Sequence, residues 1–340
     1  MDTLLLADEP HVTQGCDTCH KGNNQAETKE EAHEGMIARP SDNLDTCMEC
    51  HEDVSTTYGK SIHYTTIGQR EGVKARFTEE ELKIFDEKVF EQSCRSCHAS
   101  CGDCHVKSPP VSGISLGLID GHSFISRREG KTCAFCHGGR VYPEYTGEYG
   151  ATTDVHYQEG MMCLDCHKKQ EFHGDGKMYM SKQEVADRPK CIDCHEEVEA
   201  KELRVRVAHD EHKGKVSCFG CHTDGEYRNC YSCHMGTGSK AQPGFILGKN
   251  PRNPDEVTTL RIVPTVRDTF EKAGILQGKF DHVPNYWNTP AHKIKKRTDR
   301  TRSCDSCHTE KKGFLTEKDL LDDGARINRS LIHVPKPITQ

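Results

Sequence analysis

One five-residue unit, Cys-x-x-Cys-His, occurs ten times along the chain and uses all 20 cysteines of the sequence. The cysteines of the units are Cys16, Cys19, Cys47, Cys50, Cys94, Cys97, Cys101, Cys104, Cys133, Cys136, Cys163, Cys166, Cys191, Cys194, Cys218, Cys221, Cys230, Cys233, Cys304 and Cys307. The histidines that close the units are His20, His51, His98, His105, His137, His167, His195, His222, His234 and His308. Only 21 of the 340 residues are histidines, so a histidine after every pair indicates one shared chemistry.

The unit is the attachment pattern of covalent c-type haem. Each cysteine sulfur adds to one vinyl group of the porphyrin, and two intervening residues let one turn of backbone span both positions. The histidine that follows lies under the ring, where its imidazole can bind the iron as the proximal ligand. The sequence therefore predicts ten covalently bound haem c groups. It does not point to any catalytic residue.

Three other uses of paired cysteines fit the pattern less well. Zinc sites close a Cys-x-x-Cys pair with a second pair or a His-x₃₋₅-His element, and they do not need a histidine after every pair. A redox-active dithiol of the thioredoxin kind expects one pair, not ten. A secreted disulfide scaffold could use this many cysteines, but it gives no reason for the histidines.

The second axial ligand of each iron can come from the histidines outside the units. Eleven remain: His11, His33, His63, His122, His156, His173, His209, His212, His282, His292 and His333. Ten irons need ten such ligands, so the supply slightly exceeds the demand of a fully bis-histidine protein. Methionine could replace histidine at some irons and would raise their potentials. Bis-histidine ligation leaves low-spin iron closed to substrate, which is typical of an electron conductor.

Several of these histidines lie shortly before a unit in the sequence. His156 is seven residues before Cys163, and His209 and His212 are nine and six residues before Cys218. His292 shortly precedes the last unit.

The composition indicates what must position these groups. Hydrophobic residues make up 34% of the chain and aromatic residues 6%, and the mean hydropathy is −0.78. Burial of so little apolar surface does not compensate for the conformational entropy that the chain loses on folding. The porphyrins, which are large and apolar, must therefore form the core. We expect a mostly irregular fold with short α-helices wrapped around a closely packed haem chain, and very little β-structure. The clearest helix is 78–94, where Thr78 and Glu81 form a capping box.

The spacing of the units predicts three segments: a nine-haem array at 1–234, a haem-free insert or small subdomain at 235–303, and the tenth haem with the C-terminal tail at 304–340. Two pairs of units lie especially close, within 94–105 and 218–234. Anchors this close hold two porphyrins in near contact, which rapid electron transfer requires.

The formal charge is −7, and it becomes roughly −17 when each of ten oxidised haems adds about −1. Such a negative surface makes nucleic acid an improbable partner. It favours redox proteins or other electron acceptors. No stretch approaches the 18 apolar residues of a transmembrane helix. The first ten residues do not form an intact signal peptide. We expect an exported protein, periplasmic or extracellular, whose export signal has been removed.

The ten units and the scattered spare histidines resemble those of the multihaem c-type cytochromes of anaerobic, metal- or sulfur-respiring prokaryotes. The resemblance implies electron transfer between periplasmic donors and extracellular or other redox acceptors. Some members form filaments, so a homopolymer, a haem-lined extracellular nanowire, is an alternative. A second alternative is a reductase of nitrite, hydroxylamine or a sulfur oxyanion with one open haem. No Cys-x-x-Cys-Lys unit is present, as some nitrite reductases have, which puts that role in doubt.

Overall fold

The computed structural model describes residues 9–107, 110–111, 114–115, 123–124, 130–148, 152–195, 202–223, 225, 244–263 and 265–338. His122 and the unit from Cys230 to His234 lie outside the described residues. The chain forms two compact units; the first consists of Met1–Gly68, Cys97–Thr132 and His167–Arg188, and the second of Gln69–Ser96, Cys133–Cys166 and Pro189–Gln340. The expected division into three segments, 1–234, 235–303 and 304–340, stays a prediction.

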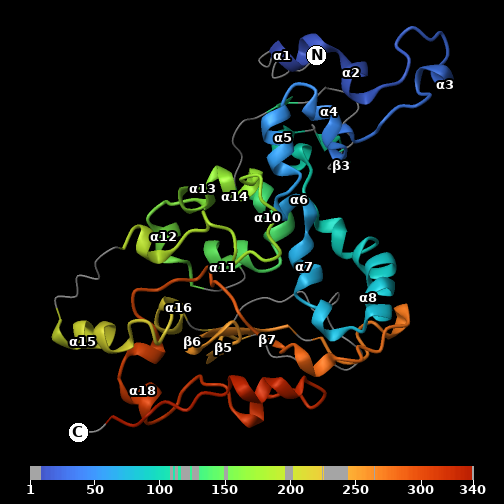
Figure 1. The fold of residues 1–340 in the computed structure, drawn as a ribbon. Coiled ribbons are helices and arrows are strands. Elements are labelled where there is room, and N and C mark those ends of the chain that lie inside the picture. Colours follow the sequence, from blue (N-terminus) through green and yellow to red (C-terminus); the bar gives the residue numbers. More distant parts are fainter. Residues whose placement is uncertain are drawn as a thin grey trace. The chain divides into compact units, whose positions relative to one another are not determined.

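Short helices dominate the first compact unit (Figure 1). They are α1 (Glu9–Gln14), α2 (Cys16–His20), α3 (Lys29–Ala32), α4 (Leu44–Met48), α5 (Glu52–Tyr58), α6 (Ile62–Thr65), α9 (Cys101–His105) and α14 (Lys169–His173). Its strands pair in two short antiparallel ladders, β1 (Val106–Lys107) with β4 (Ser123–Phe124) and β2 (Pro110–Val111) with β3 (Ile114–Ser115). Two further helices, α7 (Ile67–Glu71) and α10 (Lys131–His137), begin in the first compact unit and end in the second.

The second compact unit combines short helices with one small sheet. Its helices are α8 (Glu79–Phe85), α11 (Val141–Thr146), α12 (Val155–Gln158), α13 (Cys163–Cys166), α15 (Leu203–His212), α16 (Cys218–His222) and α18 (Asp305–His308). Its strands are β5 (Ile246–Asn250), β6 (Asn253–Ile262) and β7 (Tyr286–Asn288). The prediction of short helices joined by irregular chain, with very little β-structure, is confirmed for the described residues. None of the helices described is long and apolar enough to cross a bilayer.

The helix expected at 78–94 forms over the shorter range 79–90, with the predicted cap. Thr78 and Glu81 make the capping box, and α8 continues as a π-helical turn over Asp86–Phe90. Phe85 is buried in a cluster with Phe77, Phe90 and Ile275, and Leu82 and Val89 pack against it. The Glu81 carboxylate also accepts from the backbone nitrogens of Leu276 and Gly278 at 3.0 Å each, so the cap fixes a distant loop as well.

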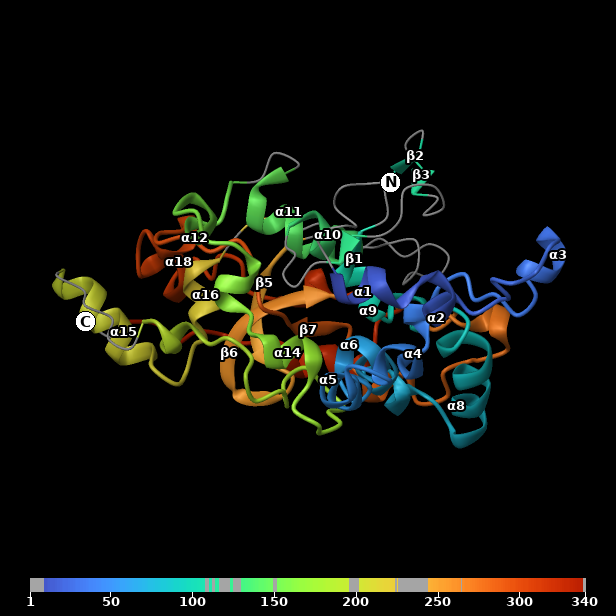
Figure 2. The ribbon, with the colours of Figure 1, turned by 90° about the horizontal axis from the view of Figure 1, so that it is seen from above.

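The antiparallel sheet β5-β6-β7 was not expected from the sequence. It lies within the predicted haem-free segment, and Figure 2 shows its strands side by side. Leu260, Ile262 and Tyr286 form its apolar core together with Leu315 and Leu331. The buried positions Thr258 and Thr259 are polar, Pro251 lies in the turn between β5 and β6, and Pro254 lies at the start of β6. These residues hide the alternation of apolar and polar positions that marks a strand.

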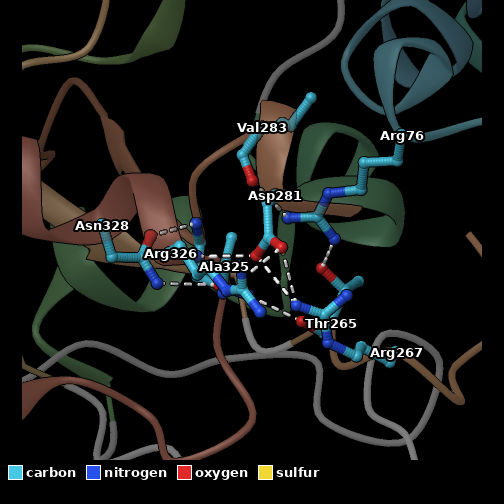
Figure 3. A network of polar contacts seen from close by, with 9 residues as sticks. Arg76, Thr265, Arg267, Asp281, Val283, Ala325, Arg326 and Asn328 are labelled. Atoms are coloured by element: carbon cyan, nitrogen blue, oxygen red, sulfur yellow. Dashed lines mark hydrogen bonds and ion pairs between the residues drawn. The ribbon is translucent and has the colours of Figure 1, made fainter. Parts of the chain in front are cut away.

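The buried side chain of Arg76 connects loops that lie next to the sheet strands in the sequence (Figure 3). Arg76 is 1% exposed, and its guanidinium donates to the carbonyls of Val283 and Pro284 at 3.2 Å each and to the Thr265 hydroxyl. It also lies over the Phe280 ring, 4.6 Å from the centroid. Burial lowers the pKa of Arg76 to about 10, so it remains a cation at neutral pH. The contacts compensate for the cost of burying that charge.

Candidate haem-binding sites

Several of the described cysteine–histidine units fold into single helical turns, which suit the attachment chemistry. Units coincide with α2, α9 and α16, and α13 holds both cysteines of a fourth unit. The two cysteines are three residues apart, so their sulfurs lie on the same side of the turn. One turn of backbone therefore presents both sulfurs together.

An aspartate before the second cysteine stabilises several of these turns. The carboxylates of Asp103, Asp165 and Asp193 each accept from the backbone nitrogen that precedes the first cysteine of their unit, at 2.8, 2.7 and 2.8 Å. This contact satisfies a nitrogen that a short helix leaves unpaired at its start. This role was not predicted from the sequence, although each aspartate lies at the same position of its unit.

Histidine rings face one another in pairs across the described structure. The pairs, with centroid distances, are His11 with His51 (6.0 Å), His105 with His173 (5.9 Å), His156 with His195 (6.1 Å), His209 with His222 (6.2 Å) and His212 with His308 (5.9 Å). Each of these described pairs joins one histidine that closes a unit with one of the eleven spare histidines. In each of these pairs, a proximal candidate therefore faces a distal candidate.

The spacing fits an iron between the two rings. A metal–imidazole bond is about 2 Å and a ring centroid lies about 1 Å behind its nitrogen, so rings on opposite sides of one metal have centroids about 6 Å apart. Within the described ranges, no three His, Cys, Asp or Glu side chains gather to hold a bare metal ion. Paired imidazoles beside two cysteines are the donor set that a haem c needs, so the residues fit the group.

The second ring nitrogen of many histidines is already used, which orients the ring. Nδ1 donates to a backbone carbonyl in His20 (Ile37, 2.7 Å), His209 (Val205, 2.8 Å), His212 (Ala208, 2.6 Å), His222 (Lys295, 3.0 Å) and His308 (Lys336, 2.6 Å). A hydrogen bond from Nδ1 leaves Nε2 as the nitrogen that can bind a metal. These rings are thus prepared for ligation by the fold itself.

Two histidines have a carboxylate at Nδ1 instead of a carbonyl. His156 contacts the Asp154 carboxylate at 2.9 Å, and His167 contacts the two Glu171 oxygens at 3.1 and 3.2 Å. Neither contact was predicted from the sequence.

His63 is a spare histidine within electrostatic reach of His167. Burial lowers the pKa of His63; Glu171 opposes this shift, and the charge of His167 adds to it. Burial also lowers the pKa of His173. Both shifts favour the neutral imidazole, which is the form that binds iron.

The remaining spare histidines have other surroundings. His33 is exposed, and its Nδ1 donates to the Lys29 carbonyl at 2.7 Å. His282 is exposed, and the His333 ring lies 5.9 Å from the Phe314 ring. The backbone nitrogen of His292 donates to Glu144 at 3.0 Å. For His33, His282, His292 and His333, the role of iron ligand stays a prediction.

One helix supplies two of the paired distal candidates. His209 and His212 are three residues apart on α15 and lie on one side of it. Their partners come from α16 and α18, whose units are far apart in the sequence. His156 likewise faces His195 and not the unit that follows it closely. Proximity along the chain therefore does not reveal these pairs.

Cysteines of different units contact one another in the first compact unit. The Cys101 thiol donates to the Cys47 sulfur, which lowers the pKa of Cys47. Burial raises the pKa of Cys19, and the nearby charge of Cys47 raises it further. The attachment sites that begin at Cys16, Cys47 and Cys101 are therefore neighbours in this order.

Four attachment sites whose cysteines lie in the second compact unit are also neighbours of one another. The Cys191 thiol donates to Cys218 and lowers its pKa. Burial and then the charge of Cys194 raise the pKa of Cys166. Burial and then Cys307 raise the pKa of Cys221 to about 11. The units that begin at Cys163, Cys191, Cys218 and Cys304 thus form a series of neighbours.

Comparison with known proteins gives one match. Residues 155–237 match the family model described as cytochrome c3. This segment contains four of the ten units, which begin at Cys163, Cys191, Cys218 and Cys230. The match supports a multihaem c-type cytochrome with covalently bound haem c and redox partners. Neither a curated protein nor a solved structure matches the chain.

Proposed function

We propose that this chain carries electrons between redox partners through ten covalently bound haem c groups, most of them held between two histidines. The observation that carries the proposal is the set of histidine pairs at 5.9–6.2 Å, each of which joins a unit-closing histidine with a spare one. When bound, haem supplies reversible one-electron chemistry at iron.

The residues of the chain have three tasks in this function. The cysteines would tether each porphyrin, and the closeness of Cys47 to Cys101 and of Cys191 to Cys218 would place neighbouring porphyrins near one another. The paired imidazoles close both faces of the iron and exclude substrate. The Nδ1 hydrogen bonds hold the imidazoles in place, so little rearrangement accompanies a change of charge.

The net charge and the family match support an exported electron carrier. At −7 before any cofactor is counted, the surface attracts basic patches of redox proteins and cationic acceptors. We place the protein in the periplasm or outside the cell, between periplasmic donors and extracellular or other redox acceptors.

The ligation state tests the proposal directly. The loaded protein is expected to hold ten haems by the pyridine haemochrome assay and to give low-spin ferric signals in electron paramagnetic resonance. Far fewer than ten haems would overturn the proposal. A high-spin signal from one haem in ten would instead favour the reductase of nitrite, hydroxylamine or a sulfur oxyanion.

A polymeric filament is the second candidate, and His33 is the observation that favours it. His33 is exposed, and its Nδ1 already donates a hydrogen bond to the Lys29 carbonyl. Among the described residues, no other imidazole contacts it. An outward Nε2 could bind the iron of a second copy. Mass photometry of natively secreted protein is expected to show long oligomers that shorten after His33→Ala. Monomers alone would remove this candidate. His11, by contrast, faces His51 of its own chain.

A further inference from the structure

We propose that Asp154 and Glu171 lower the midpoint potentials of the haems attached at Cys191 and Cys163 below those of the haems attached at Cys218 and Cys304. The inference rests on the proposed function, because it assumes the histidine pairs to be iron ligands. It concerns two carboxylates for which that function alone gives no role.

The Asp154 carboxylate is built into the structure beside His156. It is 1% exposed, and its Oδ1 accepts from the backbone nitrogen and the Nδ1 of His156 at 2.8 and 2.9 Å. Its Oδ2 accepts from the backbone nitrogen of Ile294 at 2.6 Å. In the described part of the chain, no lysine or arginine forms an ion pair with it. The negative charge is therefore directed to the imidazole.

Glu171 repeats the arrangement on a proximal histidine. Its side chain is 11% exposed and contacts Nδ1 of His167 with both oxygens. The backbone nitrogen of Lys168 donates to the same carboxylate at 3.1 Å and holds it there.

The next two attachment sites of the series differ in this respect. Their four histidines, His209, His222, His212 and His308, all donate Nδ1 to backbone carbonyls. A carbonyl is a neutral acceptor and withdraws less of the N–H proton than a carboxylate does.

The chemical consequence is a difference in ligand basicity. A carboxylate at the outer nitrogen raises the basicity of a metal-bound imidazole. A more basic ligand stabilises ferric iron more than ferrous iron, which lowers the potential, and burial keeps the effect from being screened by salt. The Cys166 and Cys194 thiols are within electrostatic reach, so the two affected haems are neighbours. The series from Cys163 to Cys304 thus begins with its two most negative members.

Asp154 also caps α12, so the test must separate capping from charge. Asparagine caps a helix as well as aspartate does, so Asp154→Asn removes the charge and keeps an oxygen for the cap. Its amide nitrogen replaces the oxygen that accepts from the Ile294 backbone nitrogen, so loss of that one hydrogen bond accompanies the loss of charge. The matched control is Asp319→Asn, because Asp319 lies outside the cysteine–histidine units and likewise accepts from a backbone nitrogen, that of Thr316, at 2.8 Å. Glu171→Gln is the independent second variant.

The experiment is a spectropotentiometric titration of the loaded protein, with electron paramagnetic resonance on poised samples. In Asp154→Asn, one haem in ten is expected to shift to a more positive midpoint potential and stay low-spin, and Glu171→Gln should shift a different haem. Asp319→Asn should leave the profile near that of the wild type. Unchanged potentials in both test variants, an equal shift in the control, or a new high-spin haem in Asp154→Asn would overturn the inference. A wild type with far fewer than ten haems would fail the proposed function itself.

Discussion

Replacing both His209 and His212 with alanine is expected to convert two of the ten haems from low-spin to high-spin iron. The two side chains lie on one side of α15, and their rings face His222 and His308 at 6.2 and 5.9 Å. Without them, each of these irons keeps only its proximal imidazole, and an open axial position produces a high-spin ferric signal. The cysteines are unchanged, so the pyridine haemochrome count should stay at ten.

The matched control for this variant is His282→Ala, which leaves ten spare histidines for ten irons. His282 is exposed. The control should remain fully low-spin. If the control became high-spin and the α15 variant did not, the assignment of the distal ligands would be wrong. Added imidazole should restore the low-spin signal of the α15 variant, since it can occupy the open position.

The second large effect is expected when the full chain is produced without haem attachment. We expect most of the helical circular dichroism to disappear. The turns α2 and α9 contain five residues each and have no buried residue, and α15 has ten residues and likewise none. Isolated helices of this length are not stable in water, because nucleation is unfavourable and tertiary packing supplies most of their stability.

The sheet should respond differently and provides an internal control. Leu260, Ile262 and Tyr286 pack directly against Leu315 and Leu331 in a cluster of buried apolar side chains. The only tryptophan, Trp287, lies on β7 under the guanidinium of Arg252, 4.4 Å from its centroid. Its fluorescence should keep a urea transition in the haem-free chain after the helical signal is gone. A haem-free chain with the circular dichroism of the loaded protein would contradict the view that porphyrins form the main core.

The sequence predicted the local structure of the attachment sites well, because their chemistry is local. Two cysteines and a histidine within five residues need one turn, and α9 and α16 are such turns. The capping box of Thr78 and Glu81 is also local, and it was correctly predicted. The sheet was missed because its buried threonines and adjacent prolines hide the strand pattern.

The partners of the histidines could not be predicted, because they depend on tertiary structure. His173 is 68 residues from His105, and His212 is 96 residues from His308, and no periodic pattern connects them. The carboxylates beside His156 and His167 were missed for a different reason. Each lies only two or four residues from its histidine, a spacing that is common on protein surfaces and has no meaning until the ring is placed.

The neighbour contacts of the Cys191 unit have a consequence for robustness. Cys191 donates to Cys218, and the charge of Cys194 raises the pKa of Cys166, so this unit lies between those that begin at Cys218 and Cys163. Under the proposed function, an electron that travels through these four described units in their order must pass this one. Loss of its haem is then expected to separate the Cys163 unit from the other two, whereas loss of the haem at Cys304 only shortens the path. Position in the order of haems, and not position in the chain, then determines the effect of a lesion.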